Sequence, residues 1–550
     1  MRPGAMHRDA AGDAAGGATA RAASPLTIRH ASHSVARFYI TTAIDYANGE
    51  PHHGHAFEKI GADAIARYHR LRGDDVWFLI GMDEHGQKVA QTAVEQGVTP
   101  QELADRIAAS FQAMWCRLRI SNDQFIRTTA PEHQSGVREL IERIFQRNPD
   151  DFYEKPYQGW YCVGCEAFKQ DAEIEDGKCI LHPTRTLEWV EERNWFFRLS
   201  RYREFLLDHI TRHEEFVQPE SRRNEILGLL RQGLEDVSAS RARFAWGVPF
   251  PRPTSDGERQ TTYVWFDALP NYWTATRVPG SRAVWPAQLH VIGKDLTRFH
   301  CVIWPAMLQA AGLELPERVF AHGFVQLGGE RFSKSAGVRL DLGEAVDRHG
   351  ADALRYFLLR EVPFDADGNF SWERFENRYT ADLANAFGNL ASRAIAMIER
   401  YRGGIVPGTS ADAMQRAAEW VTPHAAAYED AMRRQLLHEA LAAVWCVVAW
   451  ANEYVDRQAP WKLAKDPECA GELDTTLAVL AHVLAWLAIM VSPFMPAKAR
   501  ELWEQLGAPI SLGDVVWPSG ADAIRSACDV AGWHVHRGAP LFPKDSPQGS

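Results

Sequence analysis

Three histidines surround a single glycine in the segment PHHGH, residues 51–55. His52 and His55 lie three positions apart, so at the start of a helix both side chains can point the same way. Their rings could then donate hydrogen bonds to a negatively charged transition state, and Gly54 would let a bulky ligand approach the backbone. The alternatives are a zinc pair and an ordinary polar loop. The zinc pair is disfavoured because the HExxH spacing and a nearby carboxylate ligand are missing.

A second cationic segment, GGERFSKSAG, lies far along the chain at residues 328–337. Arg331 and Lys334 stand in a loop bounded by glycines, which could fold over a triphosphate and neutralise it as pyrophosphate leaves. Taken alone, this segment is typical of a solvated basic loop.

Three cysteines and a histidine form the pattern C-x2-C-x13-C-x2-H, at Cys162, Cys165, Cys179 and His182. Four ligands suffice for a closed tetrahedral zinc site, so the pattern predicts a structural and not a catalytic metal. The alternative is a set of unrelated buried thiols. The other five cysteines are interpreted as packing residues.

The elements around the histidines are typical of a βαβ unit in a parallel sheet. A buried strand, RFYITTAI, precedes them, and a helix over residues 54–73 follows and ends at Gly73. A strand at 75–81 and a helix at 100–118 come next. In a doubly wound sheet, ligands bind where strands end and helices begin. The histidines occupy that junction.

The alternation stops near residue 150, where a segment of aromatics, cysteines and short elements begins. After helical material at 200–240, strand signals return at 262–269, 289–295 and 318–324, with a helix over 297–311. We therefore expect a parallel sheet interrupted by a large insertion. Residues 380–535 are predicted to be helical.

Bulk composition is that of a soluble globular chain, with 46% hydrophobic and 24% charged residues. The formal charge of −11 excludes a protein that is basic overall, so any nucleic acid must be bound by a local surface or by shape. The apolar run 477–491 is short for a bilayer span and predicts a buried helix. Residues 1–36 are predicted to be a disordered leader, with a transit peptide as the less favoured alternative.

Together, His52–His55 and Arg331–Ser335 resemble the HIGH and KMSKS signatures of class I aminoacyl-tRNA synthetases. From residue 37 to 543 the chain is most similar to methionyl-tRNA synthetases. The resemblance is carried by the segments GMDEHGQK, YVWFDAL, HVIGKDLTRFH, AHGF, GADALRYFLLRE, DLANAFGNLASR and QAPWKLAK.

The resemblance implies an α/β fold, in which a Rossmann-like parallel sheet with a zinc-binding insertion of the one-zinc form is followed by an all-α helical bundle. The expected parts are the leader (1–36), the first half of the catalytic domain (37–150), the insertion with its zinc knuckle (151–240), the second half (241–325), the KMSKS loop with the stem-contact region (326–380) and the anticodon-binding domain (381–543).

The resemblance also assigns roles to individual residues. Methionine would be bound by Ile44, Tyr46, Asp83, Trp265, Tyr272, Asp295, Leu296 and His300. ATP would be bound by His52, Gly54, His55, Lys294, Asp295, Ser333, Lys334 and Ser335. Aromatic rings suit a thioether because they contact its polarizable sulfur favourably, and a carboxylate such as Asp83 suits an ammonium group. The alternatives are core packing for the aromatics and a helix cap or turn for the aspartates.

The anticodon of tRNA(Met) would be read by Asn385, Asn389 and Arg393, which recur at four-residue spacing, with Pro460 and Trp461 as a stacking surface. The alternative is a solvated helix face beside a buried tryptophan.

The implied reaction joins L-methionine to tRNA(Met) through methionyl-adenylate, with ATP and Mg²⁺. His52, His55, Arg331 and Lys334 would stabilise charge, and Zn²⁺ would be structural. No protein nucleophile is needed, because positioning and electrostatics carry the catalysis. The expected enzyme is a cytoplasmic monomer without a membrane anchor.

The chain departs from the family pattern at several positions around the substrate site, including Ala43, Asp45, His53, Met82 and Phe332. Asp45 is the most awkward, because a buried carboxylate beside a thioether pocket is costly unless it is paired or solvated. These departures leave two alternatives. One is a paralogue that transfers an aminoacyl adenylate to a non-tRNA acceptor such as an N-hydroxylated amine, and the other is a non-catalytic RNA-binding regulator.

Overall fold

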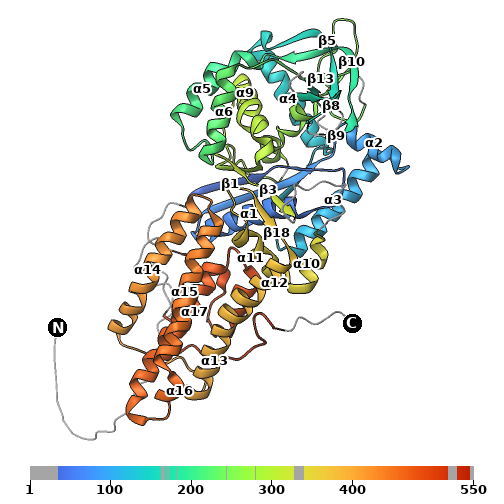
Figure 1. Ribbon diagram of the computed structural model, residues 1–550. Coiled ribbons are helices and arrows are strands. Elements are labelled where there is room, and N and C mark those ends of the chain that lie inside the picture. Colours follow the sequence, from blue (N-terminus) through green and yellow to red (C-terminus); the bar gives the residue numbers. More distant parts are fainter. Residues whose placement is uncertain are drawn as a thin grey trace, which may run out of the picture.

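The computed structural model of the chain describes residues 35–162, 167–169, 173–180, 182–242, 245–278, 280–327, 340–517 and 529–544. Figure 1 shows an elongated arrangement, with the insertion at one end, a parallel sheet in the middle and a helical bundle at the other end. The expected α/β class with a following all-α domain is confirmed.

The central sheet has seven strands in the order β11-β16-β15-β1-β3-β2, with β4 also paired to β3, and every pairing in it is parallel. β1 and β3 are buried along most of their length, as strands covered on both faces are. The strands are β1 (Arg37–Thr42), β2 (Asp45–Tyr46), β3 (Asp75–Asp83), β4 (Gln124–Arg127), β11 (Val217–Gln218), β15 (Leu289–Gly293) and β16 (Val319–His322).

Helices connect these strands in the manner of a βαβ fold. α1 runs from β1 and β2 towards β3, and its buried residues occur in every turn because the helix is enclosed by neighbouring elements. The helices of this region are α1 (His53–Leu71), α2 (Gln87–Glu95), α3 (Pro100–Arg117), α4 (Pro131–Arg147) and α9 (Trp304–Ala311).

The insertion forms antiparallel sheets of its own. A four-stranded sheet has the order β12-β10-β5-β6, and a three-stranded one has the order β7-β8-β9. The elements are β5 (Phe152–Cys162), β6 (Ala167–Lys169), β7 (Ile174–Glu175), β8 (Lys178–Cys179), β9 (His182–Thr186), β10 (Glu188–Phe197), α5 (Arg203–Arg212), α6 (Glu220–Gln232) and β12 (Val237–Ser238).

The strand predicted for residues 262–269 is wrong. These residues were expected to belong to the parallel sheet, but only Thr261–Thr262 is extended, as β14 paired with β13 (Ser240–Arg241), and α7 (Val264–Ala268) follows. A short apolar run suits a buried helix as well as a strand, and periodicity alone does not separate the two. α8 (Asn271–Thr274) continues this short helical segment.

Within the described ranges, five elements lie between the last strand of the central sheet and the helical domain. They are β17 (Val325–Leu327), α10 (Leu342–His349), α11 (Ala351–Glu361), β18 (Gly368–Phe370) and α12 (Trp372–Arg378). The helical domain then comprises a π-helical segment (Tyr379–Gly388), α13 (Asn389–Arg402), α14 (Ala411–Arg433), α15 (Leu437–Gln458), α16 (Pro460–Leu463), α17 (Ala470–Val491) and α18 (Pro496–Gln505). The segment Pro467–Val491 is long and apolar enough to cross a membrane, but 89% of its most apolar stretch is buried inside the protein. It is the core helix of the bundle.

Arg355 ties the helical domain to the sheet domain. Its fully buried guanidinium lies 2.6 Å from Asp63 on α1 and donates to the carbonyl oxygens of Leu118, Pro493 and Phe494. A buried arginine is stable only when its donors are used in this way. The two domains therefore share a fixed contact and not only a hydrophobic surface.

Candidate active site

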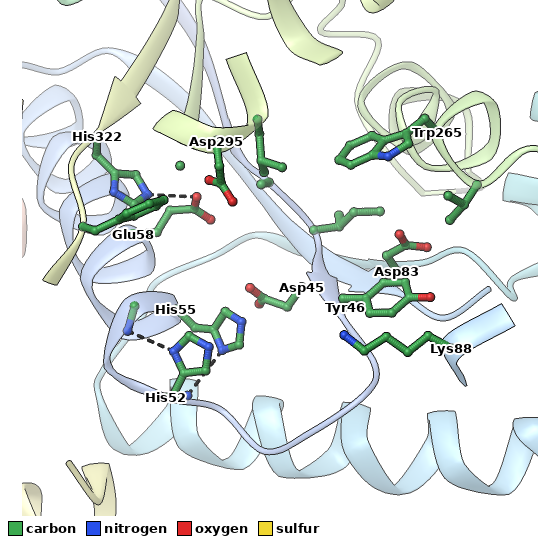
Figure 2. Close-up of a pocket in the computed structure, with 17 residues that line it drawn as sticks. Asp45, Tyr46, His52, His55, Glu58, Asp83, Lys88, Trp265, Asp295 and His322 are labelled. Carbon is green, nitrogen blue, oxygen red and sulfur yellow. Dashed lines mark hydrogen bonds and ion pairs between the residues drawn. The ribbon is translucent and has the colours of Figure 1, made fainter. Parts of the chain in front are cut away.

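A cavity of about 360 Å³ lies at the carboxyl ends of the central strands, where α1 begins. In Figure 2, His52 and His55 stand at one end, Tyr46, Asp83 and Trp265 stand at the other, and Asp45 lies between them. The remaining lining residues are Ala43, Ile44, Gly54, Glu58, Lys88, Val264, Gly293, Asp295, Leu296, His322 and Phe324. The position is the one that a doubly wound sheet uses for ligands.

The first turn of α1 fixes the orientation of two histidine rings. His52 is the N-cap, and its Nδ1 accepts from the amide of Gly54 at 3.1 Å. Nδ1 of His55 accepts from the amide of His52 at 3.3 Å, and the rings stack with centroids 3.7 Å apart. Because each Nδ1 is an acceptor, the proton of each neutral ring is on Nε2. Both rings therefore hold an Nε2–H donor suited to an anion.

Gly54 leaves room for the His52 ring. A Cβ at residue 54 would stand 3.0 Å from Cε1 of His52, so a larger residue would require a small shift of the capping ring. His53 behaves differently from its neighbours: it is buried and does not line the cavity, and burial lowers the pKa of its ring. Two of the three clustered histidines thus face the site.

The opposite end of the cavity combines a carboxylate with an aromatic wall. Asp83 ends β3, and β2 pairs with β3 so that Tyr46 lies beside Asp83 in the register. Trp265, on α7, stacks on Phe299 with ring centroids 3.6 Å apart and nearly parallel planes. Phe299 begins a π-helical turn, a feature common at functional sites. This end suits an ammonium group joined to an apolar side chain.

Two residues predicted to contact methionine lie behind this wall. His300 and Tyr272 are buried, do not line the cavity, and are joined by a hydrogen bond of 2.7 Å between His300 Nε2 and the tyrosine hydroxyl. Nδ1 of His300 donates to the carbonyl of Leu296 at 3.0 Å, so Nε2 accepts from Tyr272. Burial lowers the pKa of His300 to about 4, so the ring is neutral. Their contact with methionine stays a prediction.

Asp45 belongs to a buried ionic cluster that includes a lysine. Lys59 Nζ lies 2.7 Å from Asp45 Oδ1, 2.8 Å from Glu58 Oε1 and 2.9 Å from the carbonyl oxygen of Ala43. Glu58 Oε2 lies 3.1 Å from His322 Nε2. The carboxylate that was awkward in the sequence therefore has an ionic partner within the fold. Even so, burial raises the pKa of Asp45 to about 7, with Lys59 opposing the rise.

Lys294 and Asp295 are adjacent in sequence but have different surroundings. Asp295 lines the cavity, whereas Lys294 Nζ forms an ion pair with Asp367 at 2.6 Å and does not line it. The remaining predicted ATP contacts, Arg331, Ser333, Lys334 and Ser335, lie outside the described residues. Of the predicted ATP residues that the structure describes, it brings together His52, Gly54, His55 and Asp295.

Several residues that line the cavity escaped prediction from the sequence, among them Glu58, Lys88, His322 and Phe324, as did Lys59, which is buried behind Asp45 and Glu58. A signal existed for Glu58, which continues the three-residue spacing of His52 and His55 along α1. Lys59 is a charged residue in a helix whose other buried positions are largely apolar, which indicates a buried partner.

The predicted anticodon residues lie on consecutive parts of the helical domain. Asn385 lies in the π-helical segment, Asn389 begins α13, and Arg393 follows on the same helix. The Arg393 guanidinium lies 5.8 Å from the ring centroid of Trp461 and forms an ion pair with Asp456. Trp461 is 38% exposed, and Pro460 is buried. An exposed indole beside a guanidinium is a surface on which an unpaired base can stack.

The predicted zinc ligands are described only in part. Cys162 ends β5 and Cys179 lies in β8, and both thiols are buried. Cys179 faces His182 across the β8–β9 ladder. Cys165 and the His182 side chain lie outside the described part of the chain. Among the described residues, no three candidate ligands come together as a metal site.

Comparison with known proteins gives consistent matches over nearly the whole chain. Residues 38–395 match the family model of class I tRNA synthetases (M), and residues 406–545 match the anticodon-binding domain of methionyl tRNA ligase. A methionine–tRNA ligase of Brucella melitensis is 46% identical over 518 residues, covering 92% of this chain and 98% of its own. A methionine–tRNA ligase of Caldanaerobacter subterraneus is 42% identical, and the match covers 92% of this chain and 78% of that protein. The structure of Mycobacterium tuberculosis methionyl-tRNA synthetase with methionyl-adenylate superposes with a TM-score of 0.84 at 40% identity, covering 92% of this chain and all of that chain.

Proposed function

The chain belongs to the methionyl-tRNA synthetase family of class I tRNA synthetases, and we propose that it joins L-methionine to tRNA(Met) in two steps at this cavity. The methionine carboxylate attacks the α-phosphorus of ATP, and pyrophosphate leaves with its magnesium ion. The terminal ribose hydroxyl of the tRNA then attacks the carbonyl of the adenylate and forms the ester to methionine, and AMP leaves. A protein nucleophile is required in neither step.

One observation carries the proposal: oriented imidazole donors and a carboxylate beside an aromatic wall occupy two ends of one cavity. The Nε2–H groups of His52 and His55 stabilise the negative charge that develops on the phosphates. Asp83 holds the α-ammonium group, and Trp265 and Tyr46 contact the thioether. Methionine bound in this way would have its carboxylate between the Asp83–Trp265 end of the cavity and the histidine end, close to the nucleotide.

Arg331 and Lys334 act in the same step, as cations that neutralise the departing pyrophosphate. This assignment is supported by the KMSKS-like sequence of residues 331–335. Asn385, Asn389, Arg393, Pro460 and Trp461 read the anticodon, which the exposed indole beside a guanidinium supports.

A structural zinc ion is part of the proposal. Cys162, Cys165, Cys179 and His182 would hold it, and it would brace the insertion. The proposal is supported by two buried thiols, since zinc prefers thiolate and imidazole ligands, and by the pairing of Cys179 with His182 across neighbouring strands. The zinc would take no part in the two chemical steps.

The acceptor is tRNA and not a small amine. The Brucella melitensis relative named methionine–tRNA ligase matches over 98% of its length, and the helical domain matches an anticodon-binding model. The chain is further expected to act as a monomer in the cytoplasm. Size-exclusion chromatography with light scattering tests the oligomeric state.

Two assays test the function. ATP–pyrophosphate exchange with a panel of amino acids is expected to show exchange with methionine above all others. Charging of a tRNA(Met) transcript is expected to follow. Exchange without charging would favour the alternative acceptor, and the absence of exchange with every amino acid would exclude synthetase activity.

A further inference from the structure

One carboxylate oxygen, Oδ2 of Asp45, has no hydrogen-bonding partner among the residues that the structure describes. Asp45 is only 5% exposed and lines the cavity, and its Oδ1 is bound by Lys59. Its Oδ2 is buried and accepts no hydrogen bond from any described residue. A buried carboxylate oxygen that accepts no hydrogen bond costs free energy, so we expect a ligand to donate a hydrogen bond to it.

Lys59 cannot supply that donor. Its ammonium group has three hydrogens, and three acceptors already surround it: Ala43 O, Asp45 Oδ1 and Glu58 Oε1. Lys59 is fully buried, so it holds Asp45 in one orientation through Oδ1. The position of Oδ2 is fixed by the same contact.

The location of Asp45 limits the identity of the donor. Figure 2 places its carboxylate between the histidine end and the Asp83–Trp265 end. On the proposed function, this is where the phosphate, the carboxyl and the α-ammonium groups meet. A phosphate oxygen is repelled by a carboxylate, and a thioether has no hydrogen to donate. The donors that remain are the ammonium group and the hydroxyls of the nucleoside, and the ammonium group is favoured because it also carries the charge opposite to that of the carboxylate.

We propose, on the basis of the proposed function, that Asp45 is a second carboxylate for the α-ammonium group of methionine, beside Asp83, and that Lys59 is its positioning residue. The electrostatic surroundings agree: burial raises the pKa of Asp45 despite Lys59, so an additional cation stabilises the ionised carboxylate. The other charged or titratable groups around it are Glu58, Lys59, Asp83, Lys88, Asp295, His52, His55 and His322.

The test uses the full-length protein in methionine-dependent ATP–pyrophosphate exchange. Asp45→Ala is expected to raise the KM for methionine about 10- to 100-fold, the range for a hydrogen bond to a charged group, with the KM for ATP nearly unchanged. Asp45→Asn keeps an acceptor but loses the charge, so its KM for methionine is expected to lie between the values for the wild-type protein and for Asp45→Ala. The double variant Asp45→Ala/Lys59→Met removes both members of the pair and leaves Glu58 with His322, so it reports on binding even if the single variant folds poorly.

A ligand without the ammonium group separates a direct contact from a structural effect. The inhibition constant of 4-(methylsulfanyl)butanoate, which is methionine without its amino group, is expected to be the same for the wild-type protein and for Asp45→Ala. Arg282→Gln, which removes an exposed ion pair with Asp75, is the control variant.

An unchanged methionine KM in both Asp45→Ala and the double variant would overturn the inference. A rise in the KM for ATP alone would overturn it as well, because that result would assign Oδ2 to the nucleoside. An equal loss of affinity for the deaminated compound would also contradict it. Failure of the proposed function looks different, because the wild-type protein itself would then show no exchange with methionine.

Discussion

His85 Nδ1 lies 2.6 Å from Asp267 Oδ2, joining two segments that are 182 residues apart in the sequence. His85 stands two residues after Asp83, and Asp267 stands two residues after Trp265. His133 contacts the other carboxylate oxygen at 3.0 Å, so the buried aspartate is held on both sides. The contact fixes the end of β3 against α7. It thereby sets the position of Trp265 relative to Asp83.

Replacement of Asp267 is expected to weaken the fold most at neutral pH. Burial alone would raise its pKa, but His85 and His133 outweigh that effect and lower the pKa from 3.8 to about 2. A depressed carboxyl pKa stabilises the folded state above about pH 4 by about 2 kcal/mol, and this contribution is lost as the pH falls from about 4 to 2. The free energy of unfolding of Asp267→Asn should therefore differ more from that of the wild-type protein at pH 7 than at pH 3 in urea unfolding, because about half of the contribution is lost by pH 3. An equal difference at both values would contradict the assignment.

Removal of either oriented imidazole should slow adenylate formation. His52→Ala and His55→Ala are each expected to reduce kcat in ATP–pyrophosphate exchange about 100-fold, as the loss of one donor to a developing anion does. His53→Val is the matched control, because this buried neighbour does not line the cavity. It should retain most of the activity. A comparable loss in all three variants would indicate a structural role for the whole segment.

The buried ion pair makes a stability prediction that is separate from binding. Lys59→Met leaves Asp45 and Glu58 without their shared ammonium, and breaking a buried pair in this way costs about 3–5 kcal/mol. Asp45→Ala should cost less, since Lys59 keeps Glu58 and the Ala43 carbonyl. In the double variant the two losses should not add. Urea denaturation of the four proteins measures the coupling, and strictly additive losses would be inconsistent with the pair.

Truncation of the exposed indole beside Arg393 should affect tRNA and not methionine. Trp461→Ala is expected to raise the KM for tRNA(Met) about 10-fold or more, since stacking of one base contributes about 1–3 kcal/mol. Its ATP–pyrophosphate exchange should be unchanged. Trp420→Ala, at a tryptophan of α14 that is 57% exposed, is the control for a general effect on the helical domain. Equal losses of charging in both variants would argue against a specific role of Trp461 in anticodon recognition.

Metal analysis tests the zinc proposal. The purified protein is expected to contain about one zinc ion per chain, and Cys162→Ser or Cys179→Ser should lose it, because a closed site needs all four ligands. Cys446→Ser, at an exposed cysteine of α15, should keep the metal. Inductively coupled plasma mass spectrometry provides the measurement. Full zinc content in all three variants would exclude this ligand set.

The sequence by itself determined the local structure and much of the chemistry. Apolar periodicity located β1, α1 and β3, because whether a residue is buried repeats with the geometry of each element. The spacing of His52 and His55 at a helix start was sufficient to predict that the two side chains lie together, and both line one cavity. The order of strand, turn and helix also indicated which edge of the sheet holds the cavity.

The tertiary structure decided the contacts between distant segments. Val264–Ala268 form a helix because of the elements that enclose them, and the apolar pattern of this segment suits either form. Lys294 pairs with Asp367 and does not line the cavity, although its neighbour Asp295 does. Asp45 appeared unfavourable until the fold placed Lys59 against it. A buried charge is stable or costly according to its partners, and partners are chosen by packing and not by sequence spacing.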